Sequence, residues 1–199
     1  MSDRTAIEWT DRTWNPIIGC RRVSPGCQNC YAERQAVRQK DRGYAGLVRS
    51  TDGGPRWTGE VRLVEDRLKD PLGWRRPQRV FVDSMGDLFA EGVEEAWLDA
   101  VWAVMAFADR HTFQVLTKRP DRMRDYLLAR ARSSAPWEAA ARRLGLSLRY
   151  DDGERSIGLI PWPLPNVVVG TSVEDQERAD LRLPALLATP AACRMVSFE

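Results

Sequence analysis

The 199-residue sequence lacks several features that would assign it to a familiar class of protein. It has one histidine and three lysines, so arginine supplies nearly all of its 30 basic residues. No apolar run approaches the roughly 20 residues that a membrane-spanning helix needs. The first eight residues lack the basic and apolar segments of a signal peptide. We therefore expect a cytoplasmic protein that makes no membrane contact.

A large net charge is also absent. The formal charge is +2, and the arginines are scattered along the chain, so charge alone does not argue for nucleic-acid binding. The balance of 43% hydrophobic and 29% charged residues is that of an ordinary globular protein. A chain of this length holds one hydrophobic core, and we expect a single domain over residues 1–199.

Cysteine is scarce but clustered. Four cysteines are too few for a secreted disulfide framework, yet Cys20, Cys27 and Cys30 lie within eleven residues, with the spacing Cys-x6-Cys-x2-Cys. Glycine and proline in this segment allow the chain to turn tightly enough to bring the three thiols together. The pattern predicts a metal centre. Cys193 stands alone and is interpreted as a small buried hydrophobic residue.

Two kinds of metal centre fit three thiolates. A [4Fe–4S] cluster would use all three and leave one iron open to a ligand. Zinc would need a fourth ligand or a water; Cys193 is the candidate, and His111, just before a predicted strand, is interpreted as a loop residue. The first hypothesis is an iron–sulfur enzyme. The alternative is a non-catalytic, zinc-stabilised binding module.

Short β-rich runs alternate with helical patterns along the chain, which indicates an α/β fold with a parallel sheet. We predict a full or partial TIM-like (β/α) barrel, truncated at the C-terminus because the chain stops at a strand. The stretch around 132–165 is an insertion, either folded over the site or a surface excursion. Strands are predicted at 79–84, 112–117, 166–171 and 194–199, with weaker ones at 16–19 and 59–64; helices are predicted at 31–38, 65–74, 93–109, from 120, and at 174–187.

Polar residues follow the predicted strands, where β/α barrels place their active sites. These candidates for cofactor binding are Asp83, Ser84, Lys118, Glu174 and Glu199. Lys118 and Arg119 together suit a carboxylate or phosphate. The alternative is that such residues cap the following helices. For Ser84 and Ser172 both interpretations stay open.

Several motifs resemble a phage and bacterial three-cysteine-motif family of unknown function. They are Trp14-Asn-Pro16, Gly19-Cys20, Ser24-Pro-Gly-Cys27, Asn29-Cys30-Tyr-Ala32, Val82-Asp-Ser-Met-Gly-Asp-Leu-Phe89, Leu116-Thr-Lys-Arg-Pro120, Gly170-Thr-Ser-Val-Glu-Asp-Gln176 and Val196-Ser-Phe-Glu199. That family is similar to radical S-adenosylmethionine proteins, in which three cysteines hold a [4Fe–4S] cluster. The usual spacing there is Cys-x3-Cys-x2-Cys, so this chain has three extra residues in the first gap.

The resemblance implies a cluster-dependent enzyme that uses S-adenosylmethionine. The cluster would donate an electron, and the cofactor would yield a radical. The substrate and the catalytic residues stay unassigned. Nucleic acid and a partner protein are the two candidate classes of partner, on analogy alone.

Overall fold

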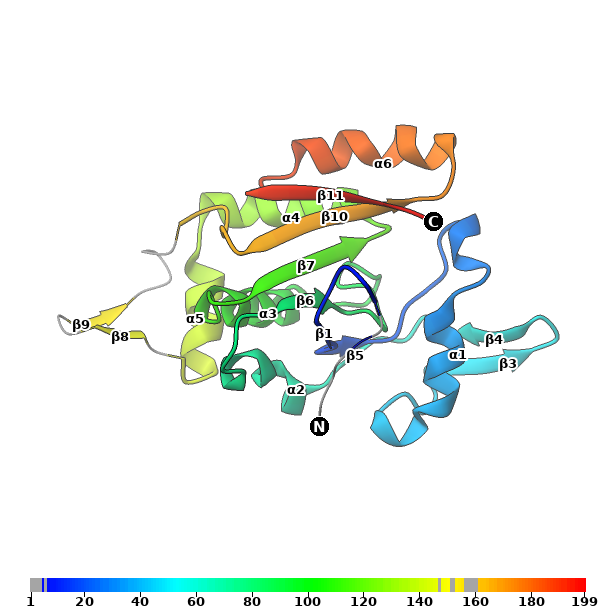
Figure 1. Cartoon of the computed structure of the whole chain (residues 1–199), viewed down its shortest axis with the longest axis horizontal. Helices are drawn as coiled ribbons and strands as arrows, with labels where there is room; N and C mark the ends of the chain where they lie inside the picture. Colours follow the sequence, from blue (N-terminus) through cyan, green and yellow to red (C-terminus); the bar gives the residue numbers. More distant parts are fainter. Residues whose placement is uncertain (1–4, 6, 147, 151–152, 156–160) are drawn as a thin grey trace.

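The computed structural model describes residues 5, 7–146, 148–150, 153–155 and 161–199. Its centre is a five-stranded sheet in which every neighbouring pair is parallel. The spatial order of the strands follows the chain, so all their carboxyl ends meet at one edge (Figure 1). The strands are β1 (Arg12–Trp14), β6 (Arg79–Val82), β7 (Thr112–Thr117), β10 (Val167–Val173) and β11 (Cys193–Phe198).

The sheet is open. β1 and β11 are its two edges, and no pairing within the described part of the chain joins them. The α/β class and the parallel sheet are therefore confirmed, but a closed TIM-like barrel is not formed. Too few strands enter the sheet, because two of the six predicted strands pair elsewhere.

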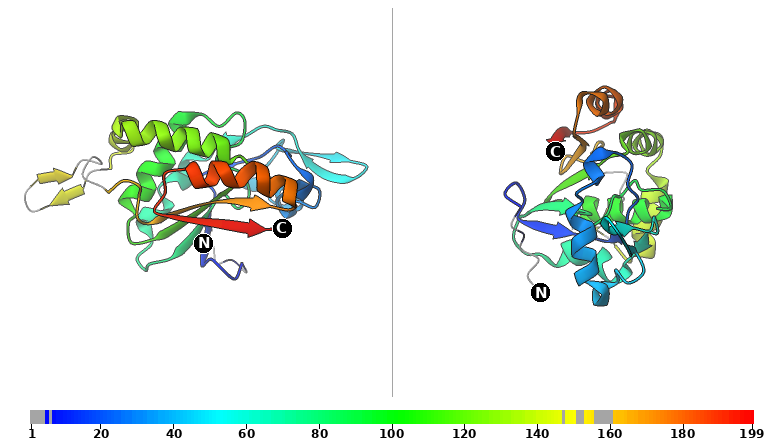
Figure 2. Two further views of the ribbon diagram at one scale, coloured as in Figure 1. Left: turned by 90° about the horizontal axis from the view of Figure 1, so that it is seen from above. Right: turned by 90° about the vertical axis from the view of Figure 1, so that its right-hand side faces the viewer.

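Helices α3 (Glu95–Phe107), α4 (Pro120–Arg132) and α6 (Gln176–Ala188) cover one face of the sheet (Figure 2). Alternation along the strands explains which face they cover, because successive side chains point to opposite sides. The inward side chains of β6 and β7 are at most 1% exposed, and they pack on the apolar stripe of α3. These inward side chains are Val80, Val82, Phe113 and Val115.

The opposite face carries Phe81 and Leu116, and none of the helices α3, α4 and α6 lies over it (Figure 2). The segment before β1 lies against it instead. Trp9 packs on Phe81 with ring centroids 4.7 Å apart, and its carbonyl accepts a hydrogen bond of 3.2 Å from the Gln114 side chain. At one end, this face reaches the edge of the sheet where the carboxyl ends of the strands lie.

Short elements surround the predicted first strand. Residues 16–19 and 59–64 were expected to enter the main sheet, but β2 (Ile17–Ile18) and β5 (Arg62–Leu63) pair with each other, antiparallel. The sheet uses β1, which the sequence analysis missed because its three residues form no apolar run. Helix α1 (Tyr31–Arg38) is confirmed with its predicted bounds, and a hairpin of β3 (Val48–Thr51) and β4 (Gly54–Trp57) follows it.

The predicted helix 65–74 is split. α2 (Glu65–Leu68) stops after one turn, and a 3-10 turn (Asp70–Gly73) follows. Pro71 explains the break, because it has no backbone N–H to continue an α-helix. Another 3-10 turn covers Lys40–Arg42.

The stretch 132–165 is only partly an excursion. Helix α5 (Ala135–Arg143) belongs to the core: Trp137 is 2% exposed and stacks on Trp102 with centroids 6.5 Å apart. The hairpin of β8 (Leu148–Tyr150) and β9 (Gly153–Arg155) lies beyond the amino ends of the strands (Figure 1). Residues 147, 151–152 and 156–160 lie outside the described residues. The described part of this stretch therefore does not fold over the cysteines. Among the described helices, none has the length and apolarity to cross a membrane.

Candidate functional site

The cysteine loop begins at Gly19, directly after β2, and ends at Cys30, the residue before α1. Gly19 has a φ of +96°, and a Cβ there would lie 2.2 Å from the carbonyl oxygen of Glu60. Only glycine fits both the backbone angle and the space. A 3-10 turn at Pro25–Cys27 then reverses the chain. These local features set the path of the loop that carries the three cysteines.

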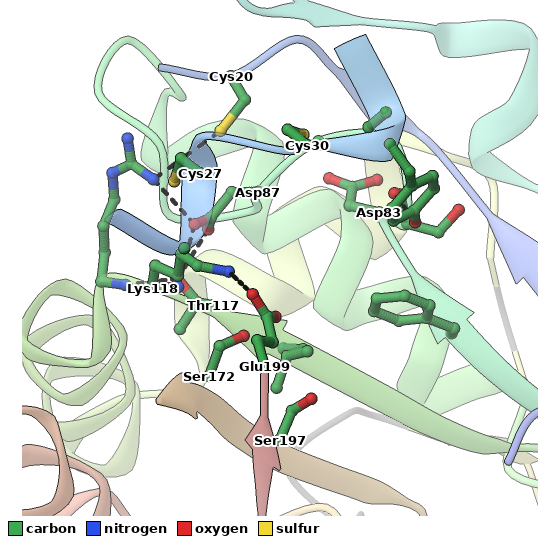
Figure 3. Close-up of a pocket in the computed structure, with 18 of the residues that line it drawn as sticks. Cys20, Cys27, Cys30, Asp83, Asp87, Thr117, Lys118, Ser172, Ser197 and Glu199 are labelled. Carbon is green, nitrogen blue, oxygen red and sulfur yellow. Dashed lines mark hydrogen bonds and ion pairs between the residues drawn. The ribbon is translucent and has the colours of Figure 1, made fainter. Parts of the chain in front are cut away.

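A cavity of about 380 Å³ lies at the carboxyl edge of the sheet, under this loop (Figure 3). Three walls enclose it: the cysteine loop, the ends of the strands, and an apolar side formed by Trp9, Phe81 and Leu116. Four of the five predicted cofactor-binding residues line it together with the cysteines. The polar lining is Cys20, Arg21, Cys27, Asn29, Cys30, Tyr31, Asp83, Ser84, Asp87, Thr117, Lys118, Arg119, Ser172, Ser197 and Glu199.

An ion pair fastens the loop to α1. Arg22 Nε donates to Glu33 Oε1 at 2.9 Å, and a second guanidinium nitrogen pairs with the other carboxylate oxygen. Glu33 is 1% exposed and also accepts from the Trp57 backbone N–H at 2.9 Å. A buried carboxylate needs such partners to remain charged. The loop is thereby fixed to both α1 and β4 without any metal.

Asp87 organises the opposite wall and was not predicted as a site residue. Its carboxylate accepts hydrogen bonds from the Thr117 hydroxyl at 2.7 Å, the Phe89 N–H at 2.9 Å, the Lys118 N–H at 3.3 Å and Arg119 Nη1 at 2.9 Å. A carboxylate with this many donors is held in one orientation. Its position in the sequence could have indicated this role, because Asp87 lies four residues after Asp83 in the polar segment that follows β6.

Asp83 is the most unusual residue of the site. It follows β6 with a φ of 55°, a left-handed conformation that is uncommon outside glycine. Oδ1 accepts the Ile17 N–H at 3.2 Å, whereas Oδ2 is buried and finds no partner among the described residues. Burial raises the pKa of this carboxyl well above its usual value. Asp83 borders the cavity (Figure 3), but its unpartnered Oδ2 has almost no exposed surface, so a ligand reaches it only when the side chain or a neighbour moves.

Lys118 and Glu199 meet across the cavity. The Lys118 ammonium lies 2.5 Å from Glu199 Oε2, and the pair spans from the end of β7 to the residue after β11 (Figure 3). The side chains are 17% and 34% exposed. Ser172 and Ser197 lie below the pair. Such a partly exposed pair exchanges partners at low cost, so each end can turn to an incoming charged group.

Glu174 does not line the cavity. It is held from behind by Arg182 at 2.8 Å, and its other oxygen accepts the Gly26 N–H at 3.3 Å. It supports the cysteine loop from outside instead of facing a ligand. The helix-capping alternative is wrong for Ser172, because Asp175 caps α6 by accepting the Arg178 N–H at 2.7 Å. Ser84 bonds to Asn15 Oδ1 at 3.2 Å.

The two remaining candidate ligands lie elsewhere. Cys193 begins β11, whereas the cavity is at the other end of that strand, roughly 16 Å along it at about 3.3 Å per residue. It is also exposed, not buried as predicted. His111 is 1% exposed, and its Nε2 bonds to the Pro71 carbonyl at 3.0 Å. Neither residue completes a zinc site with the loop cysteines.

Among the described residues, no three or more His, Cys, Asp or Glu side chains are placed to hold one metal ion. Tetrahedral zinc would require its sulfur ligands within about 3.8 Å of each other, given Zn–S bonds of about 2.3 Å. A cluster makes a different demand, because each thiolate binds a separate iron atom. The residues present fit a cluster in their chemistry: three half-buried thiols border one cavity, on a loop held by the Arg22–Glu33 ion pair and the Gly26–Glu174 hydrogen bond.

The electrostatics of Cys20 differ from those of a free thiol. Burial, followed by the negative charge of Asp87, raises the pKa of the Cys20 thiol from 9.0 to about 12, while Arg119 opposes this change. The metal-free thiol therefore stays protonated at neutral pH. Metal binding would have to displace that proton.

This pKa predicts slow alkylation of Cys20 in the metal-free protein. At pH 8 the thiolate is about 1,000-fold scarcer than for an unperturbed thiol of pKa 9; its greater intrinsic nucleophilicity recovers about 20-fold, so iodoacetamide should react about 50-fold more slowly. The rate should rise about tenfold per pH unit through pH 10. Mass spectrometry of timed digests, with free cysteine as the reference, measures both. A rate that levels off near pH 9 would contradict the buried, protonated thiol.

The fold and the site together define a class: an α/β protein with an open parallel sheet and a cysteine-lined cavity at the carboxyl ends of its strands. The chain belongs to a family described as a protein of unknown function (DUF5131), which it matches over residues 4–199. No match was found among curated proteins or among solved structures.

Proposed function

We propose that this protein is an iron–sulfur enzyme of the radical S-adenosylmethionine type, with a [4Fe–4S] cluster held by Cys20, Cys27 and Cys30. The observation that carries the proposal is the placement of all three thiols and the polar strand ends around one cavity. Sequential parallel strands with the site at their carboxyl ends are also the arrangement of a partial β/α barrel. When bound, the cluster would supply the electron that cleaves S-adenosylmethionine to a radical.

The residues of the chain have separable tasks in this proposal. The cysteine loop would present the thiolates from a scaffold that Glu33 and Glu174 already fix. Asp83 would turn its unpartnered oxygen, buried in this structure, to an amino or hydroxyl group of the cofactor. Lys118 would bind the cofactor carboxylate after releasing Glu199, because an ammonium and a carboxylate form a strong charge-assisted hydrogen bond. Trp9, Phe81 and Leu116 would exclude water from one side.

Anaerobic reconstitution with iron and sulfide tests the proposal. We expect a brown protein with about four iron atoms per chain, whose absorption spectrum or electron paramagnetic resonance signal changes when S-adenosylmethionine is added. A colourless protein that retains no iron would refute the iron–sulfur assignment. A cluster whose spectra do not respond to the cofactor would refute the radical type alone.

Lys118→Ala should weaken S-adenosylmethionine binding about tenfold, which corresponds to about 1.4 kcal/mol and lies near the usual contribution of a hydrogen bond to a charged group. Isothermal titration of the reconstituted protein measures the dissociation constant. Lys69→Ala is the matched control, because Lys69 is exposed and lies outside the cavity lining. Equal affinity in the Lys118 variant and the wild type would remove Lys118 from the cofactor site.

A further inference from the structure

Arg119 was expected to bind a ligand together with Lys118, but its contacts are already complete. Nε and Nη2 bond to Glu91 Oε2 at 3.2 and 2.8 Å, and Nη2 also bonds to the Arg21 carbonyl at 2.9 Å. Nη1 bonds to Asp87 Oδ2 at 2.9 Å and reaches Cys20 Sγ at 4.0 Å. A guanidinium has five N–H donors, and here each has an acceptor.

Burial makes this arrangement rigid. The Arg119 and Asp87 side chains are 9% and 8% exposed, so the pair is almost wholly removed from water. Removing one member of a buried pair is costly, because the other charge is left uncompensated. Asp87 is itself held by three further donors. Arg119 therefore has no freedom to swing toward a ligand.

Two of these contacts reach consecutive residues of the cysteine loop, the Cys20 sulfur and the Arg21 carbonyl. They tie the end of β7 to Cys20 and Arg21, which we call the Cys20 arm of the loop. The Arg22–Glu33 pair and the Gly26–Glu174 hydrogen bond hold later residues of the loop. The planar fork matters here, because it spreads five donors over three nitrogens, whereas a lysine has three donors on one nitrogen and cannot supply all five contacts. Arg119 also places its positive charge against the Cys20 sulfur and favours negative charge there.

We propose that Arg119 is a positioning residue that clamps the Cys20 arm of the loop and stabilises negative charge on the Cys20 sulfur. This inference rests on the proposed cluster for its electrostatic part only. A permanent positive charge beside a cluster ligand favours the reduced cluster, because reduction adds one negative charge. Removing it leaves the Asp87 carboxylate facing that ligand without compensation. The reduction potential should therefore fall.

The test compares Arg119→Met with wild type and with Arg124→Met, a control on the surface of α4 whose ion pairs involve Asp121 and Asp125. For the reconstituted proteins, a dye-mediated titration followed by electron paramagnetic resonance measures the potential. We expect the one-electron reduction constant of Arg119→Met to fall at least tenfold, equivalent to 59 mV. We expect no change in Arg124→Met.

Hydrogen–deuterium exchange of the metal-free proteins tests the clamp without a cluster. Amides in residues 19–28 should exchange at least tenfold faster in Arg119→Met than in wild type, with the core strands unaffected. Should Arg119→Met fail to fold, Arg119→Lys takes its place: it keeps the charge and loses the fork, so loop exchange should rise while the potential stays near that of wild type.

The outcomes separate the two proposals. A wild-type protein that retains no iron refutes the proposed function and the electrostatic part of this inference, and loop exchange alone then decides on the clamp. A wild type that holds its cluster, with an unchanged potential and unchanged loop exchange in Arg119→Met, overturns the inference and leaves the proposed function standing.

Discussion

Replacing Cys27 by alanine should reduce the iron retained after reconstitution from about four atoms per chain to less than about one. Cys27 closes the 3-10 turn of the loop and borders the cavity together with the other two thiols. Loss of one thiolate would leave a second iron atom without a protein ligand and exposed to solvent. Cys20→Ala and Cys30→Ala should behave in the same way. Colorimetric iron and sulfide assays on the desalted protein measure the loss.

Cys193→Ala is the matched control. This thiol is exposed at the amino end of β11, away from the cavity, so the variant should retain iron as the wild type does. Far-UV circular dichroism shows whether each variant is folded before its metal content is interpreted. Wild-type iron content in Cys27→Ala would remove Cys27 from the ligand set and with it the proposed coordination.

The second large effect concerns stability. Asp99→Ala should lower the free energy of unfolding by about 3–5 kcal/mol, the usual cost of breaking a buried ion pair. Asp99 is 6% exposed and accepts hydrogen bonds from Arg130 Nε at 2.7 Å and from the Tyr126 hydroxyl at 2.9 Å. That hydroxyl in turn accepts the Trp137 indole N–H at 2.8 Å. The variant would leave Arg130 with only the exposed Glu95, at 2.9 Å, as its ion-pair partner where α3, α4 and α5 meet.

Urea unfolding followed by circular dichroism measures this difference by linear extrapolation. Asp125→Ala removes an ion pair from α4, the helix that carries Arg130, but Asp125 is 66% exposed and pairs with Arg124 at the surface. We expect that change to cost less than about 1 kcal/mol, as is usual for exposed pairs. Similar losses in the two variants would mean that the α3–α4 pair does not hold the helices together.

Long elements with a clear period were predictable from sequence. β7 and α1 have the predicted bounds, α4 begins at the predicted Pro120, and α3 and α6 differ from the prediction by one or two residues at each end. The apolar spacing of such elements indicates both the type of element and the buried face. The three-residue β1 carries no such period. Its place in the sheet depends on pairing with Val80–Val82, which is far away in the chain.

Some residues of the site were likewise predictable from the sequence, and others were not. Strand ends marked Asp83, Lys118 and Glu199 as neighbours, because parallel strands in one sheet end at one edge, and the structure places all three in the cavity. Glu174 follows its strand equally closely but turns to Arg182 and Gly26. Strand position predicts the edge of the sheet, whereas the direction of a side chain depends on which partners lie near it.

By itself, the sequence determined the α/β class, the parallel strands and the clustering of three cysteines, because periodicity and spacing are local properties of the chain. Only the tertiary structure decided that the sheet is open, that Asp87 and Arg119 form the wall behind Cys20, and that Asp83 keeps a buried oxygen without a partner among the described residues. These outcomes depend on contacts between residues far apart in the chain. The free energies of these contacts come from burial and from charge pairing, which a local sequence pattern does not indicate.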